Sequence, residues 1–148
     1  MLIEKEIPES YFRNDYHKTL VNIFYTSGFV VEKLKNFLEQ DDITPQQYNI
    51  LRILKLSNKP LSTLKIREQM LDKMSDTSRI VERLLKKELV HKQTSTSDKR
   101  LVDVTLTEKG VQLLQRLEKN ADQFDSVVSH LSDDEIKALN SMLDKIRE

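Results

Sequence analysis

Apolar residues recur at helical spacing along most of the chain, and this pattern predicts a mainly α-helical protein. The first helical run extends from a capping hydroxyl at Ser10 to about Gln40. Gly28 interrupts this run, at a cost of about 1 kcal/mol relative to alanine. Such a glycine is either tolerated or allows another helix to approach closely, and we favour the close approach. The apolar positions of the run are Leu20, Ile23, Phe24, Val30, Val31, Leu34, Phe37 and Leu38.

A second helix is predicted to begin after Thr44. Thr44 as N-cap, Pro45 at the first helical position and Gln47 three residues after the cap form a capping box. The run Ser57–Pro60 ends this helix. Its buried stripe is Tyr48, Ile50, Leu51, Ile53 and Leu54.

Two short helices joined by a tight turn near residues 72–73 are predicted next. The first begins at Leu61–Ser62, and its inward positions are Leu64, Ile66, Met70 and Leu71. The second covers Met74–Lys87, and its apolar face is Thr77, Ile80, Val81, Leu84 and Leu85. Its other face is polar and basic, with Ser75, Ser78, Arg79, Glu82, Arg83 and Lys86. This pair of helices matches a helix-turn-helix.

A β-hairpin follows, from the strand-like Leu89–Val90 through a charged tip to a strand of alternating apolar residues. Val102, Val104 and Leu106 share one face of that strand, and Leu101, Asp103 and Thr105 share the other. Thr107 offers an N-cap to the next helix, with Glu108 in its first turn. Helix, hairpin and helix together predict a winged helix-turn-helix, and the usual partner of that fold is duplex DNA.

The C-terminal part is predicted to hold two more helices. The helix from Thr107 has the spacing of a coiled-coil seam at Leu113, Leu117, Ala121, Phe124, Val128 and Leu131. Ser132 and Glu135 form a second capping box for the last helix, whose stripe is Ile136, Leu139, Met142, Leu143 and Ile146. The helices at both ends have the most apolar surface left to bury. We therefore expect each to pair with its copy in a two-fold homodimer.

Composition supports a lean, helical fold. The 148 residues are 38% hydrophobic and 32% charged, with only 2 glycines and 3 prolines, which argues against a β-rich protein. The formal net charge is zero, with 24 basic and 24 acidic residues. Between Lys59 and Gly110 we count 12 basic against 8 acidic residues, a surplus that suits a DNA-facing segment. Ordinary fluctuation explains a surplus of this size equally well.

The chain lacks the residues that several classes of function require. The chain has no cysteine, which excludes disulfides, thiolate metal sites and thiol-based redox sensing. His17, His91 and His130 are far apart, and Gly28 and Gly110 form no phosphate-binding loop, so we expect no enzyme, no metal and no cofactor. Gly110 instead permits close packing beside the hairpin. The first ten residues carry acids and lack an apolar core, so we expect no signal peptide. The chain has no apolar stretch long enough to span a bilayer and no cysteine, so we expect a cytoplasmic protein without a membrane partner.

Asp98, Arg100, Leu106, Thr107 and Gly110 fit the pattern D-x-R-x-x-x-x-x-L-T-x-x-G. This wing signature resembles that of the MarR family of bacterial transcriptional regulators. The run Ser78–Leu84 resembles the core of that family's recognition helix, and the order of helices matches over nearly the whole chain. Two positions depart from the family: Glu88 stands where glycine is usual, so the recognition helix should end without its easiest left-handed cap, and Arg67 stands where a small residue is usual.

The resemblance implies a homodimer with interlocked terminal helices and one winged helix-turn-helix per subunit. Residues 1–43 would be an N-terminal dimerisation helix, 44–110 the DNA-binding region and 111–148 the C-terminal dimerisation helices, all in one intertwined domain. Members of the family typically repress from palindromic operators, and many release DNA when a small ligand binds.

The candidate DNA contacts fall into two groups. Those of the recognition helix are Ser75, Asp76, Ser78, Arg79 and Arg83, and those of the wing are Thr94, Thr96, Ser97, Asp98, Lys99 and Arg100. Arg79 can bond guanine O6 and N7 together, unless it is only paired with Asp76 or Glu82 along the helix. Asp76 either accepts from a cytosine amine or, as we favour, holds a neighbouring arginine. Arg100 is the expected minor-groove probe, which Asp98 would orient, while the remaining wing residues would reach phosphates.

The main alternative is a winged helix that contacts proteins without specific DNA binding, because fold does not fix function. Effector identity is not encoded in any motif. A trigger would be a small molecule, a histidine-based metal site or nothing. Six aromatic residues either line a cavity between the dimer helices and the DNA-binding region or pack in the core: Tyr11, Phe12, Tyr16, Phe24, Tyr25 and Tyr48.

Overall fold

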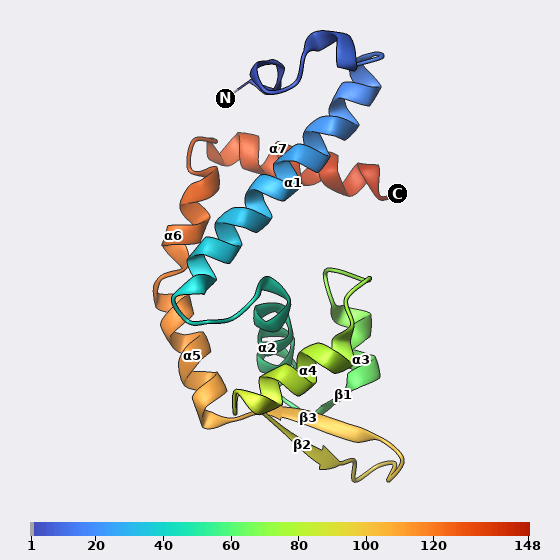
Figure 1. Ribbon diagram of the computed structural model, residues 1–148, viewed down its shortest axis with the longest axis vertical. Coiled ribbons are helices and arrows are strands. Elements are labelled where there is room, and N and C mark those ends of the chain that lie inside the picture. The colour runs from blue at the N-terminus through green and yellow to red at the C-terminus, as the bar shows by residue number, and fades with distance from the viewer. Residues whose placement is uncertain (1) are drawn as a thin grey trace.

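Helices account for most of the protein, and one small antiparallel sheet lies at one end of it (Figure 1). The computed structural model describes residues 2–148. The α-helices are α1 (Asp15–Glu39), α2 (Pro45–Ser57), α3 (Thr63–Gln69), α4 (Thr77–Lys86), α5 (Glu108–Lys119), α6 (Ala121–Asp125) and α7 (Asp133–Ile146). The strands are β1 (Leu61–Ser62), β2 (Val90–Thr94) and β3 (Val102–Leu106). Short 3₁₀ turns cover Ile3–Lys5, Glu9–Tyr11 and Ser126–Val128.

Helices α2, α3 and α4 pack with the sheet into one lobe. The strand order is β1-β3-β2, with Leu61 opposite Val104 and Val90 opposite Leu106. Val81, Leu84 and Val104 are fully buried in the lobe core. Removal of such side chains from water stabilises a fold by about 1.5–3 kcal/mol each. The expected class, mainly helical with a β-hairpin wing, is confirmed.

The remaining helices form an outer frame, defined here as α1, α5, α6 and α7. In Figure 1, α5 and α6 lead away from the sheet toward the end of the molecule where α7 and the first half of α1 lie. The rings of Phe37 and Phe124 stack with centroids 6.3 Å apart and join α1 to α6. Among residues 2–148, no helix combines the length and the apolar character that a bilayer crossing requires.

Three of the predicted helix caps, at Thr44, Thr107 and Ser132, are present. The Thr44 hydroxyl accepts from the Gln47 N–H at 3.2 Å, and the Gln47 side chain accepts from the Thr44 N–H at 3.1 Å. The Thr107 hydroxyl accepts from the Gly110 N–H at 3.0 Å. Ser132 and Glu135 form the second capping box. These boundaries were predictable because each depends on residues only three positions apart.

Three expectations about the first half of the chain were wrong. Helix α1 begins at Asp15 under an Asn14 cap, and Ser10 lies in a 3₁₀ turn instead. Leu61–Ser62 is a strand, because both residues pair with β3, and Ser62 caps α3. Leu64 and Leu71 are not inward but exposed, Leu71 at 88%.

The second half of the chain also differs from the expectations. Helix α4 starts at Thr77 with Asp76 as its N-cap, so residues 74–76 precede the helix. The helix after the hairpin stops at Lys119, and Leu113 and Leu117 are buried in the lobe core, not in an intersubunit seam. Val102 is exposed, because its part of β3 extends beyond the core toward the hairpin tip.

The recognition helix α4 ends in a left-handed cap although the residue there is not glycine. Glu88 has φ 60°, its N–H donates to the Leu85 carbonyl at 3.0 Å, and the Leu89 N–H donates to the Leu84 carbonyl at 3.0 Å. This is the hydrogen-bond pattern of a Schellman motif. Glu88 therefore supplies the conformation that glycine would adopt without steric cost.

Gly110 lies directly against the start of the hairpin. A Cβ at this position would be 2.3 Å from the Leu89 carbonyl oxygen, closer than any carbon can approach. The same oxygen accepts from the Thr107 N–H at 3.1 Å, so the backbone of Leu89 has little freedom to retreat. The predicted close packing of Gly110 beside the hairpin is confirmed.

Gly110→Ala should therefore destabilise the protein by roughly 1–3 kcal/mol, the usual cost of overpacking. The measurement is urea unfolding followed by circular dichroism. Gln115→Ala, an exposed change in the same helix, is the control and should stay within about 0.5 kcal/mol of the wild type. Equal stability of the two variants would contradict the close contact.

Candidate nucleic-acid interface

Helix α4 presents a polar face to solvent along its whole length. Ser78, Arg79, Glu82, Arg83 and Lys86 are exposed on this face. The opposite face is buried in the lobe core and holds the helix in place. The expected division of this helix into an apolar and a polar side is confirmed, and the polar side is open to a partner.

Asp76 acts as the N-cap of α4 and also pairs with Arg79. One carboxylate oxygen accepts from the Arg79 backbone N–H at 3.1 Å, and the other lies 3.6 Å from Arg79 Nε. Both side chains are exposed, and an exposed ion pair of this kind is worth little. The Arg79 guanidinium can therefore leave Asp76 for a stronger acceptor at small cost. Asp76 precedes the helix instead of occupying its first turn.

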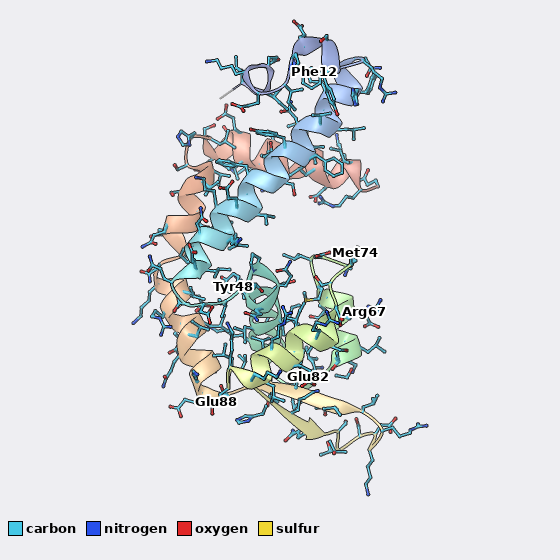
Figure 2. The ribbon with its side chains drawn as sticks, in the orientation of Figure 1. Phe12, Tyr48, Arg67, Met74, Glu82 and Glu88 are labelled. Atoms are coloured by element: carbon cyan, nitrogen blue, oxygen red, sulfur yellow. The ribbon has the colours of Figure 1, made fainter. Side chains whose placement is uncertain are left out.

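Glu82, the other partner considered for Arg79, is occupied elsewhere. Its carboxylate accepts from Lys92 of β2, so the pair links the middle of α4 to the hairpin. Figure 2 shows Glu82 on α4 above the hairpin strands. The recognition helix and the wing are thus joined on their outer side as well as through the core.

At the wing tip, Asp98 holds Arg100 through three hydrogen bonds. Asp98 Oδ1 accepts from the Arg100 N–H at 3.0 Å and from Arg100 Nε at 3.2 Å, and Oδ2 accepts from Nη2 at 3.2 Å. The Arg100 side chain is 90% exposed. The side-chain bonds from Arg100, followed by its backbone N–H, lower the pKa of Asp98 below its ordinary value of 3.8. The tip therefore presents an oriented guanidinium to solvent.

The serines of the wing stabilise the loop itself. Ser95 is buried, and its N–H donates to the Leu101 carbonyl at 2.9 Å. Its hydroxyl lies 2.9 Å from the Ser97 hydroxyl and accepts from the Ser97 N–H at 3.3 Å. Ser97 is thus engaged within the hairpin although it is exposed, as Thr94, Thr96 and Lys99 also are. Ser95 was missed by the sequence reasoning, because nothing local distinguishes it from its neighbours.

A hollow of about 470 Å³ lies between α3 and the start of α4. The hydroxyls of Ser75 and Thr77 are buried in its wall and have no hydrogen-bond partner within residues 2–148, and Thr77 is only 3% exposed. Thr63 and Arg67 of α3 complete the polar lining. Figure 2 shows Arg67 on α3 and Met74 in the loop before α4. The sequence alone gave no signal for this hollow, because it forms only where α3 packs beside the start of α4.

The six aromatic residues considered for an effector cavity do not form one cluster, although the rings of Tyr11 and Phe12 meet edge to face. Phe12 lies near the N-terminus and Tyr48 in the lobe, as Figure 2 shows. Tyr16 and Phe24 are exposed on α1. In the described chain, residues 2–148, no cluster of three or more histidine, aspartate or glutamate side chains could hold a metal ion.

Comparison with known proteins identifies the group to which this fold and exposed helix belong. Residues 43–102 match the family model of the MarR family. The regulator MhqR of Bacillus subtilis is 25% identical over 117 residues, which are 78% of this chain and 79% of that protein. A MarR-like transcription regulator from Bacillus cereus shares the fold with a TM-score of 0.81 and 22% identity, over 90% of this chain and 96% of that one. A mutant MarR of E. coli complexed with operator DNA matches with a TM-score of 0.78 and 21% identity, over 99% of this chain and 98% of that one.

The exposed helix, the charged wing and the sheet order define a winged helix-turn-helix fold. Residues 43–102 of the chain match the MarR family of transcription regulators, and the fold of the chain is that of solved MarR-like structures.

The pKa of Asp98 provides a direct test of the wing geometry. A carboxylate whose pKa is lowered in the folded protein stays ionised and paired at any pH above its ordinary pKa. It loses the pair as the pH falls through the lowered pKa. An NMR titration of the Asp98 carboxyl carbon should therefore give a midpoint below 3.8 in the wild type. Arg100→Gln should raise this midpoint toward the ordinary value, while Lys99→Gln should leave it in place. An unchanged midpoint in Arg100→Gln would show that the pair does not form in solution.

Proposed function

We propose that the protein is a sequence-specific transcriptional regulator that binds a palindromic operator as a homodimer, represses from it and is released by a small-molecule effector. The observation that carries this proposal is the shared exposure of the α4 polar face and the Arg100 wing tip on one lobe. A homodimer would present two such lobes, and two-fold symmetry of the protein calls for two half-sites related by symmetry.

Major-groove reading is assigned to α4. Its 10 residues span about 15 Å, and the groove is about 12 Å wide, so the N-terminal half of the helix can enter it. Arg79 is the proposed base reader, because its guanidinium can satisfy guanine O6 and N7 at once. Ser78 and Arg83 would contact the adjoining backbone or base edges, and Asp76 would orient Arg79. The Ser75 side chain, expected at this surface, is not available for such a contact because its hydroxyl is buried in the wall of the hollow.

Minor-groove and backbone contacts are assigned to the wing. Arg100 would enter a narrow, A·T-rich groove, where the negative potential is enhanced. Asp98 would orient that guanidinium without touching DNA. Thr94, Thr96 and Lys99 would reach phosphates, with Ser97 beside them, and such contacts supply most of the affinity.

Dimerisation is proposed from the apolar surface that one chain leaves uncovered. On α1, Tyr16, Leu20, Phe24 and Val31 are exposed along one stripe, and Gly28 lies on the same stripe with nothing within 4 Å of it. On α7 the exposed positions are Leu139, Met142 and Ile146. Large exposed apolar patches mark interaction surfaces. A second copy would cover both stripes, and the glycine would let its backbone approach α1 closely. In this arrangement residues 1–43 and 111–148 serve dimerisation and residues 44–110 serve DNA binding.

A candidate effector site lies beside the corner between α1 and α2. A hollow of about 400 Å³ is bordered by the apolar side chains of Val31, Ile43 and Pro45 and by the basic Lys35 and Lys87. The acidic Glu39 and Asp42 also border this hollow, and Lys87 is paired with Asp42, so Lys35 would have to bind the acidic group of a small aromatic acid. A regulator of this kind would act in the cytoplasm, where its operator lies.

One observation favours a second function, protein contact through the lobe. Leu64, Leu71 and Met74 are exposed around the loop between α3 and α4, Met74 at 93%. A partner protein could cover this patch. The measurement below separates the two functions, because protein contact requires neither arginine of the interface.

Arg79→Ala should weaken binding to operator DNA by about 1–3 kcal/mol and relax the sequence preference. Arg100→Ala should weaken binding mainly at operators with A·T-rich flanks. Fluorescence anisotropy with labelled duplexes measures both effects. Lys137→Ala on α7 removes the same charge outside the interface and should bind like the wild type. Unchanged affinity in both arginine variants would refute the proposed readout.

The dimer should sediment at about twice the 17.4 kDa of one chain in analytical ultracentrifugation. Phe24→Glu places a charge in the proposed interface and should shift the protein toward monomer, because an unpaired buried charge is strongly unfavourable. Asn36→Glu introduces the same charge at another exposed position of α1 and serves as the control. A monomeric wild type, or a Phe24→Glu variant as dimeric as the control, would contradict the assignment.

A further inference from the structure

The corner between α1 and α2 is tied to the end of the recognition helix by a charged pair. Lys87 Nζ donates to Asp42 Oδ2 at 3.0 Å and also to the Asp42 backbone carbonyl. Asp42 adopts φ 51°, so the chain turns sharply at this residue between the two helices. Lys87 directly follows the last residue of α4. The pair therefore connects the outer frame to the helix that would read DNA.

The end of α4 is fastened on its other side to α5. Lys109 Nζ donates to the Lys87 carbonyl at 2.9 Å, and the Thr107 hydroxyl donates to the Glu88 carbonyl at 2.7 Å. The neighbouring Asp41 accepts from Arg116 Nε at 3.1 Å. The C-terminal end of α4 is consequently held from two directions, whereas its N-terminal end carries only exposed side chains on the polar face.

Two kinds of contact act at this corner, apolar packing and hydrogen bonds. Leu38 and Ile43 are buried in the lobe core and hold the end of α1 there, but apolar contact is non-directional. Two hollows, of about 400 and 300 Å³, both border on Asp42 and Lys87, so the pair bridges a space that packing leaves open. Hydrogen bonds depend strongly on angle, and the lysine bonds supply the direction that the apolar contact lacks.

A small change of this angle would matter at the DNA. Helix α4 is about 15 Å long, so a rotation of about 10° at its C-terminal end moves its N-terminal end by about 3 Å. This displacement is close to the rise of about 3.4 Å per base pair. In a symmetric dimer both recognition helices would move, and their separation would change by more than one base-pair step.

We propose that Lys87 and Asp42 form a clamp that fixes the angle between α1 and the winged-helix lobe and thereby sets the half-site spacing that the dimer accepts. Lys87 and Asp42 are positioning residues in this role, because they act through α4 and not by contact with bases. The spacing part rests on the proposed function, whereas the fixed angle within one chain does not.

The angle is measured by double electron–electron resonance, which gives the distance between two spin labels on one chain. Labels attached to Glu32→Cys on α1 and Gln93→Cys on β2 are specific, because the chain has no cysteine of its own. Dilution with unlabelled protein removes distances between subunits. We expect a narrow distribution in the wild type and one about twice as broad in Lys87→Met, since released domains sample many angles.

Two further variants serve as a partial loss of the clamp and as a matched control. Asp42→Asn loses the ion pair but keeps the carbonyl acceptor and a residue that tolerates positive φ, so its distribution should be intermediate. Lys86→Met loses the same charge from the same helix without touching the clamp and should match the wild type. Thermal unfolding of all variants should stay close to the wild type, because exposed pairs contribute little stability. A Lys87→Met distribution as narrow as that of the control would overturn the clamp.

The spacing part is tested with operators whose half-sites are one base pair closer, native or one base pair farther apart. The wild type should prefer one spacing by about tenfold, and Lys87→Met should prefer it by less than about threefold. Lys86→Met should weaken all three complexes alike. An intact preference in Lys87→Met would overturn the link to spacing. If the wild type bound no operator, the proposed function would be wrong. The spin-label distances would still show whether Lys87 and Asp42 fix the angle within one chain.

Discussion

The backbone of Leu89 is the point on which the arrangement of the lobe depends. Its N–H closes the last turn of α4, its carbonyl accepts from Thr107, and the same carbonyl lies against the bare backbone of Gly110. Recognition helix, hairpin and α5 therefore meet within a few ångströms, with no side chain between the last two. A contact of this kind has no slack, because protein interiors are close-packed and respond to even one added methyl group. The wing and the helix consequently move together, and a partner that contacts both meets one rigid surface.

Outside this junction the chain is held by weaker and more adjustable interactions. The pairs that orient the proposed DNA-reading groups, Asp76 with Arg79 and Asp98 with Arg100, are at the surface and can exchange for phosphate or base acceptors. The frame helices α1 and α7 leave apolar stripes uncovered in the single chain. The molecule thus combines a rigid lobe with exposed ion pairs and with frame helices whose apolar stripes are uncovered.

Sequence reasoning succeeded where structure depends on near neighbours. The caps at Thr44, Thr107 and Ser132 and the buried face of α4 follow from spacings of three and four residues. It failed where distant contacts decide: Leu61–Ser62 becomes a strand only because β3 lies beside it, and Leu113 turns into the lobe core. The start of α4 was misplaced, although Asp76 carried a readable cap signal. Within the candidate site, the spacing of Asp98 and Arg100 predicted their pairing. The hollow beside Thr77 could not be predicted, because it depends on how α3 packs against α4.

The central claim is that the lobe binds duplex DNA specifically through charged contacts, and its most direct test is the salt dependence of that binding. Anisotropy measurements would compare a labelled duplex from the protein's own upstream region with a scrambled duplex. We expect specific binding whose Kd rises by at least about a hundredfold between roughly 50 and 200 mM salt, because phosphate contacts release counterions. Equal affinity for the scrambled duplex, or binding that salt leaves unchanged, would contradict it.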